Sequence, residues 1–210
     1  MELHDAVNQI AQIRQTLAQS ATFRGYRPAT TAATGVIALG AAVVQTLVLK
    51  KPFEGDGPLV YVDIWVTAAI VSLVVVGAEL VLWARRSPSH MRSEMTVAAI
   101  HQFAPCLVAG GLLTLAICRT QGQVIWMLAG LWPILFGIGM FANVRMVGKG
   151  LNLVGAFYLL AGLLILSRGP ILAFNPWCMG GTFAIGQLLA AGVLYLKRRE
   201  IQRDVCNEDE

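Results

Sequence analysis

Six stretches of almost uninterrupted apolar residues constrain this chain of 210 residues more than any other feature. A membrane-spanning helix needs about 20 mostly apolar residues. In chain order the predicted spans are Ala29–Leu49, Tyr61–Ala84, Met95–Cys118, Gln123–Ala142, Leu151–Ser167 and Pro176–Leu196. Backbone polar groups in lipid must be paired within the segment, which favours helices. The sequence therefore predicts an all-α fold, a polytopic membrane bundle of six transmembrane helices.

The composition favours lipid over water as the surroundings of this bundle. Hydrophobic residues make up 56% of the chain and charged residues 13%, whereas soluble domains carry about 25% charged residues. So few charges cannot cover a water-exposed globule. The net charge of +4 does not indicate a nucleic-acid partner, because the basic residues cluster at the ends of the spans without interleaved aromatic residues for base stacking.

Lysine and arginine are unevenly distributed between the two sides of the predicted bundle. The loops on one side hold four of the 16 basic residues: Lys50, Lys51, Arg119 and Arg168. The other twelve lie on the side of the two termini. Because cytoplasmic segments carry the excess of basic residues, the N-terminus and the C-terminus are predicted to be cytoplasmic. Residues 1–23 lack the apolar core of a cleavable signal peptide, so the first span is expected to be retained.

The residues before the first span predict a further helix. Apolar side chains recur there at steps of three and four residues, which is one stripe of an amphipathic helix: Leu3, Val7, Ile10, Ile13, Leu17 and Ala21. We interpret it as an interfacial helix, with self-association through the stripe as the alternative. The predicted organisation is a cytoplasmic amphipathic helix and basic linker (1–27), a six-helix transmembrane domain (28–197) and a polar cytoplasmic tail (198–210).

The ends of the spans repeat faintly. Spans one, three and five end as GAAVVQTLVLKK, AGGLLTLAICR and AGLLILSR, and spans two and six as GAELVLWARR and AAGVLYLKRR. This pattern suggests three tandem helical hairpins, with chance similarity of apolar sequence as the alternative.

The stretches LWPILFGIGMFA and VGAFYLLAGLLIL resemble uncharacterised small bacterial six-helix inner-membrane proteins. The hairpins more loosely resemble acid-resistance membrane proteins built of two-helix repeats. The resemblance implies the bacterial cytoplasmic (inner) membrane and carries over no functional residue.

Two ionisable residues interrupt the spans. A charge at a helix centre costs about 2.5–3.5 kcal/mol on insertion scales. Glu79 in the second span and His101 in the third are predicted at similar depth, because their antiparallel helices share a cytoplasmic loop. A Glu79–His101 pair would lower the cost of burying both groups and would titrate near neutral pH. In the structural alternative, Glu79 reaches water or Arg85 and Arg86, and His101 bonds a neighbouring helix.

Amides and prolines complete the candidate set. Gln45 and Gln187 are predicted either to line a polar cavity or to bridge two helices. Pro105 and Pro133 predict helix kinks, and the kink at Pro105 frees a carbonyl group beside Gln102. The candidates for ligand or proton handling are Glu79, His101, Gln102, Gln187 and Gln45.

Small, aromatic and thiol side chains have structural interpretations. Glycines seven residues apart share a helix face and predict close helix contact: Gly130 and Gly137, and Gly155 and Gly162. Aromatic residues near span ends are predicted interface anchors: Tyr61, Trp65, Trp83, Trp126 and Trp177. Cys118 and Cys178 both fall near the outer face, either as a disulfide or as isolated small hydrophobes.

No catalytic residue, metal site or cofactor is predicted. The spans hold one histidine and no Cys/His cluster, and the chain lacks GxSxG, HExxH and phosphate-loop motifs. An enzyme is therefore not expected.

The leading functional hypothesis is a non-enzymatic integral membrane protein that binds or transports a small solute, or acts as the membrane subunit of a transporter. Its helices resemble the substrate-binding subunits of energy-coupling vitamin importers, which carry an AxxxA spacing on the first helix, as do Ala29 and Ala33. This resemblance implies an outward cavity under residues 50–63. The alternative is a structural or stress-response protein with a pH-sensitive Glu79–His101 pair. Expected partners are the lipid bilayer, a small-molecule ligand and a second copy or transporter subunit.

Overall fold

A computed structural model describes residues 27–86, 90–119, 124–144 and 148–208. These residues form helices and turns, without a strand. The predicted interfacial helix at residues 3–21 lies outside the described part of the chain.

Six helices in the described residues are long and apolar enough to cross a membrane, which confirms the predicted number. The helices are α2 (Pro28–Val48), α3 (Gly57–Arg86), α4 (His90–Cys118), α5 (Leu128–Ala142), α7 (Leu151–Arg168) and α9 (Pro176–Glu208). A 3-10 turn, η1 (Ile125–Met127), leads into α5, and a short helix, α8 (Pro170–Ala173), precedes α9. The predicted polar tail continues α9 as far as Glu208, because Lys, Arg, Glu and Gln favour helix and neither Gly nor Pro interrupts them.

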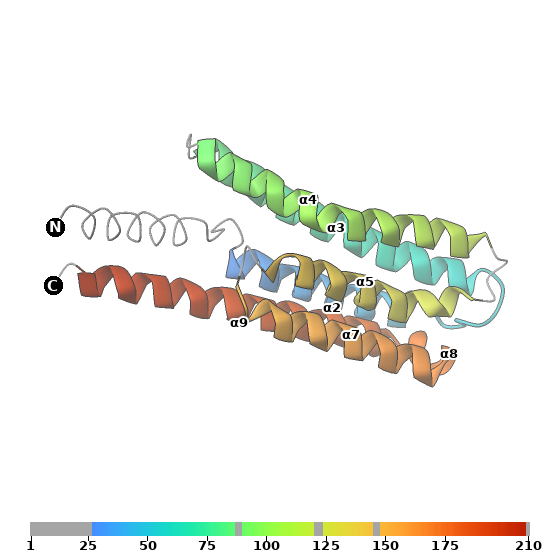
Figure 1. Ribbon diagram of the computed structural model, residues 1–210. Coiled ribbons are helices and arrows are strands. Elements are labelled where there is room, and N and C mark those ends of the chain that lie inside the picture. The colour runs from blue at the N-terminus through green and yellow to red at the C-terminus, as the bar shows by residue number, and fades with distance from the viewer. Residues whose placement is uncertain (1–26, 87–89, 120–123, 145–147, 209–210) are drawn as a thin grey trace, which may run out of the picture.

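Successive long helices run in opposite directions, so the bundle has two distinct ends (Figure 1). At the end that we call the basic end, α2, α4 and α7 begin, α3 and α5 finish, and α9 continues outward. The opposite end, called the α8 end, holds the α2–α3 loop and α8. Toward the basic end, α3 and α4 diverge from the other four helices (Figure 1).

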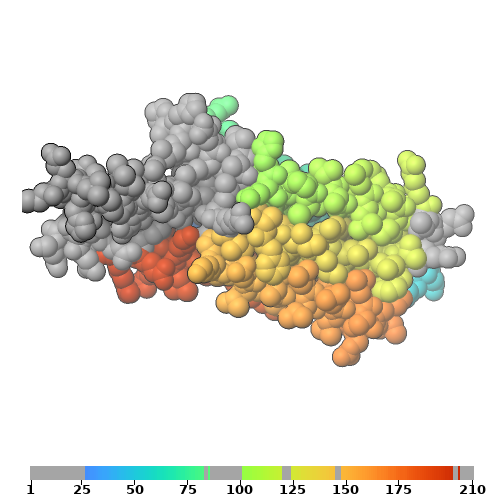
Figure 2. Space-filling view, viewed as in Figure 1, coloured from blue at the N-terminus to red at the C-terminus, as the bar shows by residue number. Residues whose placement is uncertain are grey.

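Helices α5 and α7 pack through the predicted glycine faces. A Cβ atom added at Gly130 would lie 2.6 Å from the carbonyl oxygen of Gly162, and one at Gly137 would lie 2.9 Å from that of Gly155. All four glycines are buried. The prediction of close contact through these residues is confirmed. On the molecular surface, α4, α5 and α7 lie side by side on one face (Figure 2).

Helices α2 and α9 form the second close seam, between the first and last spans. A Cβ atom at Gly35 would lie 3.3 Å from the carbonyl oxygen of Ala184, and one at Gly180 would lie 2.6 Å from the Cβ of Ala42. The two most extensive helix contacts, α2 with α9 and α5 with α7, therefore join different predicted hairpins. Hairpin partners also contact one another, but no hairpin packs as a separate unit.

The glycine seam predicts a position-specific cost of adding one methyl group. Gly130→Ala should lower the free energy of unfolding by about 1–3 kcal/mol, because overpacking forces the α5 and α7 backbones apart. Gly192→Ala on α9 is the matched control, since a Cβ atom there meets no atom within 4 Å. Thermal unfolding of the detergent-purified variants measures both. Equal melting temperatures for the two variants would contradict the close seam.

Candidate functional site

Aromatic side chains and one amide gather inside the bundle near the α8 end. We call this group the aromatic cluster: Gln45 from α2, Tyr61 and Trp65 from α3, Trp132 from α5, and Phe174 between α8 and α9. Tyr61 and Trp65 are four residues apart, so both point from the same face of α3. Gln45, Tyr61 and Trp65 are all buried, and Tyr61 has no exposed surface.

The Gln45 amide joins three parts of the bundle. Its Nε2 donates to the backbone carbonyl oxygen of Phe174 at 2.9 Å, and its Oε1 accepts from the indole Nε1 of Trp65 at 2.8 Å. Of the two predicted roles, cavity lining or helix bridging, the structure shows the bridge for this residue. Both polar atoms of the Gln45 amide therefore already have a hydrogen-bond partner in the protein.

Trp132 extends the cluster to α4. Its ring stacks on Tyr61 with centroids 6.3 Å apart, and its Nε1 donates to the hydroxyl oxygen of Thr114 at 3.0 Å. The Thr114 hydroxyl in turn donates to the carbonyl oxygen of Gly110 at 2.7 Å. Phe174 meets the Tyr61 ring edge-on at 5.1 Å. Rings from three segments thus enclose Tyr61.

The Tyr61 hydroxyl is the unsatisfied group of this cluster. It is buried and has no hydrogen-bond partner in the structure. A buried hydroxyl without a partner costs about 1–3 kcal/mol, and such a group in a native protein calls for a bound water, ion or ligand. The hydroxyl can both donate and accept. Chemically, the cluster therefore offers one free hydrogen-bonding group among aromatic walls.

The interpretation of Tyr61 and Trp65 as interface anchors was wrong. Both belong to the core, and Trp126 also packs against that core, whereas Trp177 is 54% exposed, as an anchor should be. The Trp83 side chain lies outside the described residues. An aromatic residue near a span end has the same sequence signature whether it faces lipid or protein. The sequence signal that could have placed Trp65 in the core is Gln45, because a buried amide needs hydrogen-bond partners at its own depth.

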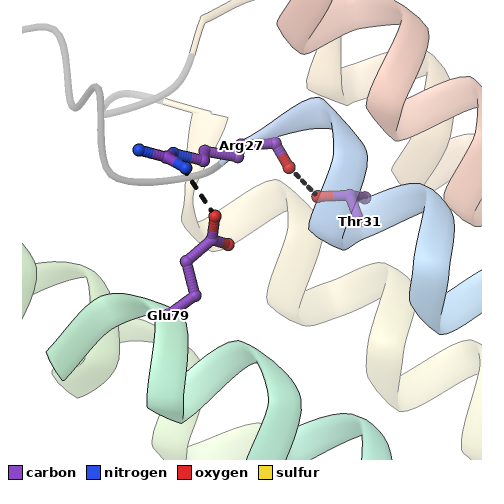
Figure 3. A network of polar contacts seen from close by, with 3 residues as sticks. All are labelled: Arg27, Thr31 and Glu79. Carbon is purple, nitrogen blue, oxygen red and sulfur yellow. Dashed lines mark hydrogen bonds and ion pairs between the residues drawn. The ribbon is translucent and has the colours of Figure 1, made fainter. Parts of the chain in front are cut away.

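Glu79 pairs with Arg27 rather than with His101. The Arg27 Nε lies 3.5 Å from Glu79 Oε1 (Figure 3), and the Glu79 side chain is 18% exposed against 56% for Arg27. The Arg27 carbonyl oxygen also accepts a hydrogen bond from the Thr31 hydroxyl. His101 is exposed on α4, and the structure records no ion pair between it and Glu79. The prediction considered only helices that share a loop. It therefore missed Arg27 at the start of α2, which lies beside Glu79.

The other amide candidates remain separate from this pair. Gln102 is half-buried on α4, and its Oε1 is buried without a hydrogen-bond partner. Gln187 is buried on α9 against Gly35, and no hydrogen bond of its amide is recorded among the described residues. The structure therefore does not join Glu79, His101, Gln102 and Gln187 through polar contacts.

Both prolines lie inside helices that continue through them. Pro105 is exposed in α4, and Pro133 is buried in α5. The predicted kinks stay a prediction.

The described thiols are free. Cys118 and Cys178 both pack, partly buried, against the core that contains Tyr61. Within the described ranges, no group of three His, Cys, Asp or Glu side chains is placed to hold a metal ion.

Comparisons with models of protein families, with curated proteins and with solved structures gave no match. The resemblance to small bacterial inner-membrane proteins therefore stays a prediction. Function has to be inferred from side-chain geometry.

The Gln45 bridge predicts a large effect of losing its amide. Gln45→Leu leaves the Trp65 indole N–H and the Phe174 carbonyl buried without partners, which should cost about 1–3 kcal/mol for each group. Gln187→Leu is the matched control, a buried glutamine on the same α2–α9 seam without a recorded hydrogen bond. Thermal unfolding should show a much lower melting temperature for Gln45→Leu. Equal losses in the two variants would contradict the bridge.

Proposed function

We propose that this chain is a non-enzymatic, multi-pass integral membrane protein that binds or moves a small solute, or serves a transporter as its membrane subunit. Large apolar side chains are exposed on all six long helices, among them Val36, Val74, Leu112, Ile138, Leu153 and Leu188. A water-soluble monomer rarely exposes apolar patches larger than a few hundred Å². A surface of this kind is suited to contact with lipid.

The Tyr61 hydroxyl carries the solute-binding proposal. It is fully buried and unpartnered, while the neighbouring Gln45 amide is engaged at both ends. No charged side chain belongs to the aromatic cluster. The solute that suits it is small and neutral, with a hydrogen-bonding group for Tyr61 and an apolar body for the rings of Trp132 and Phe174.

The α2–α3 loop supports this location. Phe53 of that loop meets Phe174 edge-on, with ring centroids 5.3 Å apart. The aromatic cluster therefore lies under the segment where the resemblance to solute-binding subunits implies a cavity. Ala29 and Ala33 are both exposed, so their methyl groups are available to a partner helix and are not used in packing within the bundle.

We propose that the basic end lies on the cytoplasmic side of a bacterial inner membrane. The fold gathers Arg27, Arg85, Lys149, Arg198 and Arg199 at that end, and the loop containing Lys50 and Lys51 lies at the other. The excess of basic residues favours a cytoplasmic location for the first group.

This orientation predicts the activity of reporter fusions. Alkaline phosphatase fused after Gly55 should be active, because that loop faces the oxidising side, and the same enzyme fused after Glu208 should be inactive. Enzyme activity in intact cells, normalised to fusion-protein level, measures both. The opposite pattern would invert the proposed topology.

Solute binding predicts ligand-dependent stabilisation that needs the Tyr61 hydroxyl. A panel of small neutral metabolites should include one that raises the melting temperature of the purified protein, by an amount equivalent to about 2.7 kcal/mol at 100 times its dissociation constant. Tyr61→Phe keeps the ring and should abolish this stabilisation.

Tyr158→Phe is the matched control for this experiment. Tyr158 is also a fully buried tyrosine, but its hydroxyl donates to the Phe183 carbonyl oxygen at 3.4 Å. The Tyr158→Phe variant should therefore keep the ligand response. A response in Tyr61→Phe equal to that of the wild type, or none in the wild type with any compound, would overturn the assignment.

The second candidate is a structural or stress-response protein. Its original basis, a Glu79–His101 pair, is replaced by the Arg27–Glu79 ion pair. This candidate is favoured by one observation, that the mostly buried Glu79 side chain pairs with Arg27, the residue that precedes α2.

A further inference from the structure

We propose that the Arg27–Glu79 ion pair is a latch that joins α3, about two turns before its end, to the start of α2, and that α3 swings further from the bundle when the latch is broken. This inference goes beyond solute binding and does not depend on it.

Helix α3 is anchored near its two ends and loosely held between them. Its buried residues near the α8 end are Gly57, Tyr61, Val62 and Trp65, and the next buried residue is Leu80. None of residues 66–79 is fully buried, and of these Val66 and Ala68 pack, partly buried, against the core that contains Tyr61. The following three helical turns, residues 69–79, have no buried side chain and therefore little packing to resist movement.

The anchor at the α8 end is firm and supplies a pivot. The Trp65 indole is hydrogen-bonded to the buried Gln45 amide, and Tyr61 stacks on Trp132. Displacing this end of α3 would leave buried polar groups unpaired, which is costly. A tilt of α3 about the Trp65 position avoids that cost and moves the basic end most.

The anchor at the basic end depends on one charge pair. Of the two ion pairs between described residues, Arg27–Glu79 joins α3 to the residue before α2, whereas Lys51 and Glu54 pair inside a loop. Glu79 is the more buried partner, and its carboxylate faces the guanidinium at 3.5 Å. Without Arg27, no recorded ion pair joins Glu79 to the α2 side of the bundle.

The surroundings of Glu79 leave room for this movement. Gly77 lies two residues before it, and a Cβ atom there would meet no atom within 4 Å. The other described charged or titratable groups on α3 and α4 near this end, Arg85 and His101, are exposed, and neither has a recorded ion pair with Glu79. Leu80, the residue next to Glu79, is buried, so the latch lies beside an apolar contact of α3.

Spin-label distances between α2 and α3 test the latch directly. Labels at Ala33→Cys and Ala78→Cys, both exposed positions, report the basic end, and labels at Leu47→Cys and Leu59→Cys report the α8 end. The four native cysteines are replaced by alanine, and the full chain is measured in lipid nanodiscs. The wild type should give one short distance at the basic end.

Breaking and remaking the charge pair should open and close the basic end. Arg27→Gln should add a longer-distance population at the 33–78 pair and leave the 47–59 pair unchanged. The charge swap, Arg27→Glu combined with Glu79→Arg, should restore the short distance. Arg85→Gln is the matched control, an exposed arginine of α3 whose loss should change neither pair.

Three outcomes would overturn the latch. One is an unchanged 33–78 distance in Arg27→Gln. Another is equal lengthening at both label pairs, which would indicate general loosening of the bundle. The last is a charge-swap variant that stays open although Arg27→Gln opens.

Discussion

A polar side chain inside an apolar helix bundle needs a partner: a threonine takes one from the preceding turn of its own helix, whereas a longer side chain takes one from another part of the bundle. This requirement accounts for the main long-range polar contacts of the described structure. The Gln45 amide takes its partners from α3 and from the segment after α8, and Glu79 takes its partner from the residue that precedes α2. The Tyr61 hydroxyl, like the Oε1 of Gln102 and the Oδ1 of Asn143, is a buried group for which the same requirement is not met by the described residues.

The six helices consequently differ in how firmly they are held. Small residues let α5 approach α7, and α2 approach α9, until backbone atoms of one helix lie where a side chain of the other would be. Helices α3 and α4 lack such a seam, and they are attached through aromatic rings, Thr114 and one ion pair. The bundle thus combines a closely packed part, which positions the aromatic cluster, with a more loosely attached pair of helices.

The position of each residue along its helix could be predicted from the sequence, but the rotation of each helix about its axis could not. Hydropathy located five of the six helices to within about five residues at each end, whereas α9 runs twelve residues past its predicted end at Leu196. The seven-residue spacing of Gly130 and Gly137 identified a true contact face. Helix α3 is apolar on all sides, so its pattern gives no direction toward the core. For that reason Trp65 was interpreted as an interface anchor, and Glu79 was assigned the wrong partner.

Helix α9 has a reach that follows from its length. It runs without interruption from Pro176 to Glu208, which at about 1.5 Å per residue is roughly 50 Å, well beyond the apolar thickness of a bilayer of about 30 Å. Its first turns pack on α2 beside Gln45 and Trp65, and its last turns carry Arg199 and Arg203 outside the bundle. One uninterrupted helix therefore extends from Gly180, which lies against α2 and near Trp65 of the aromatic cluster, to the basic residues outside the bundle.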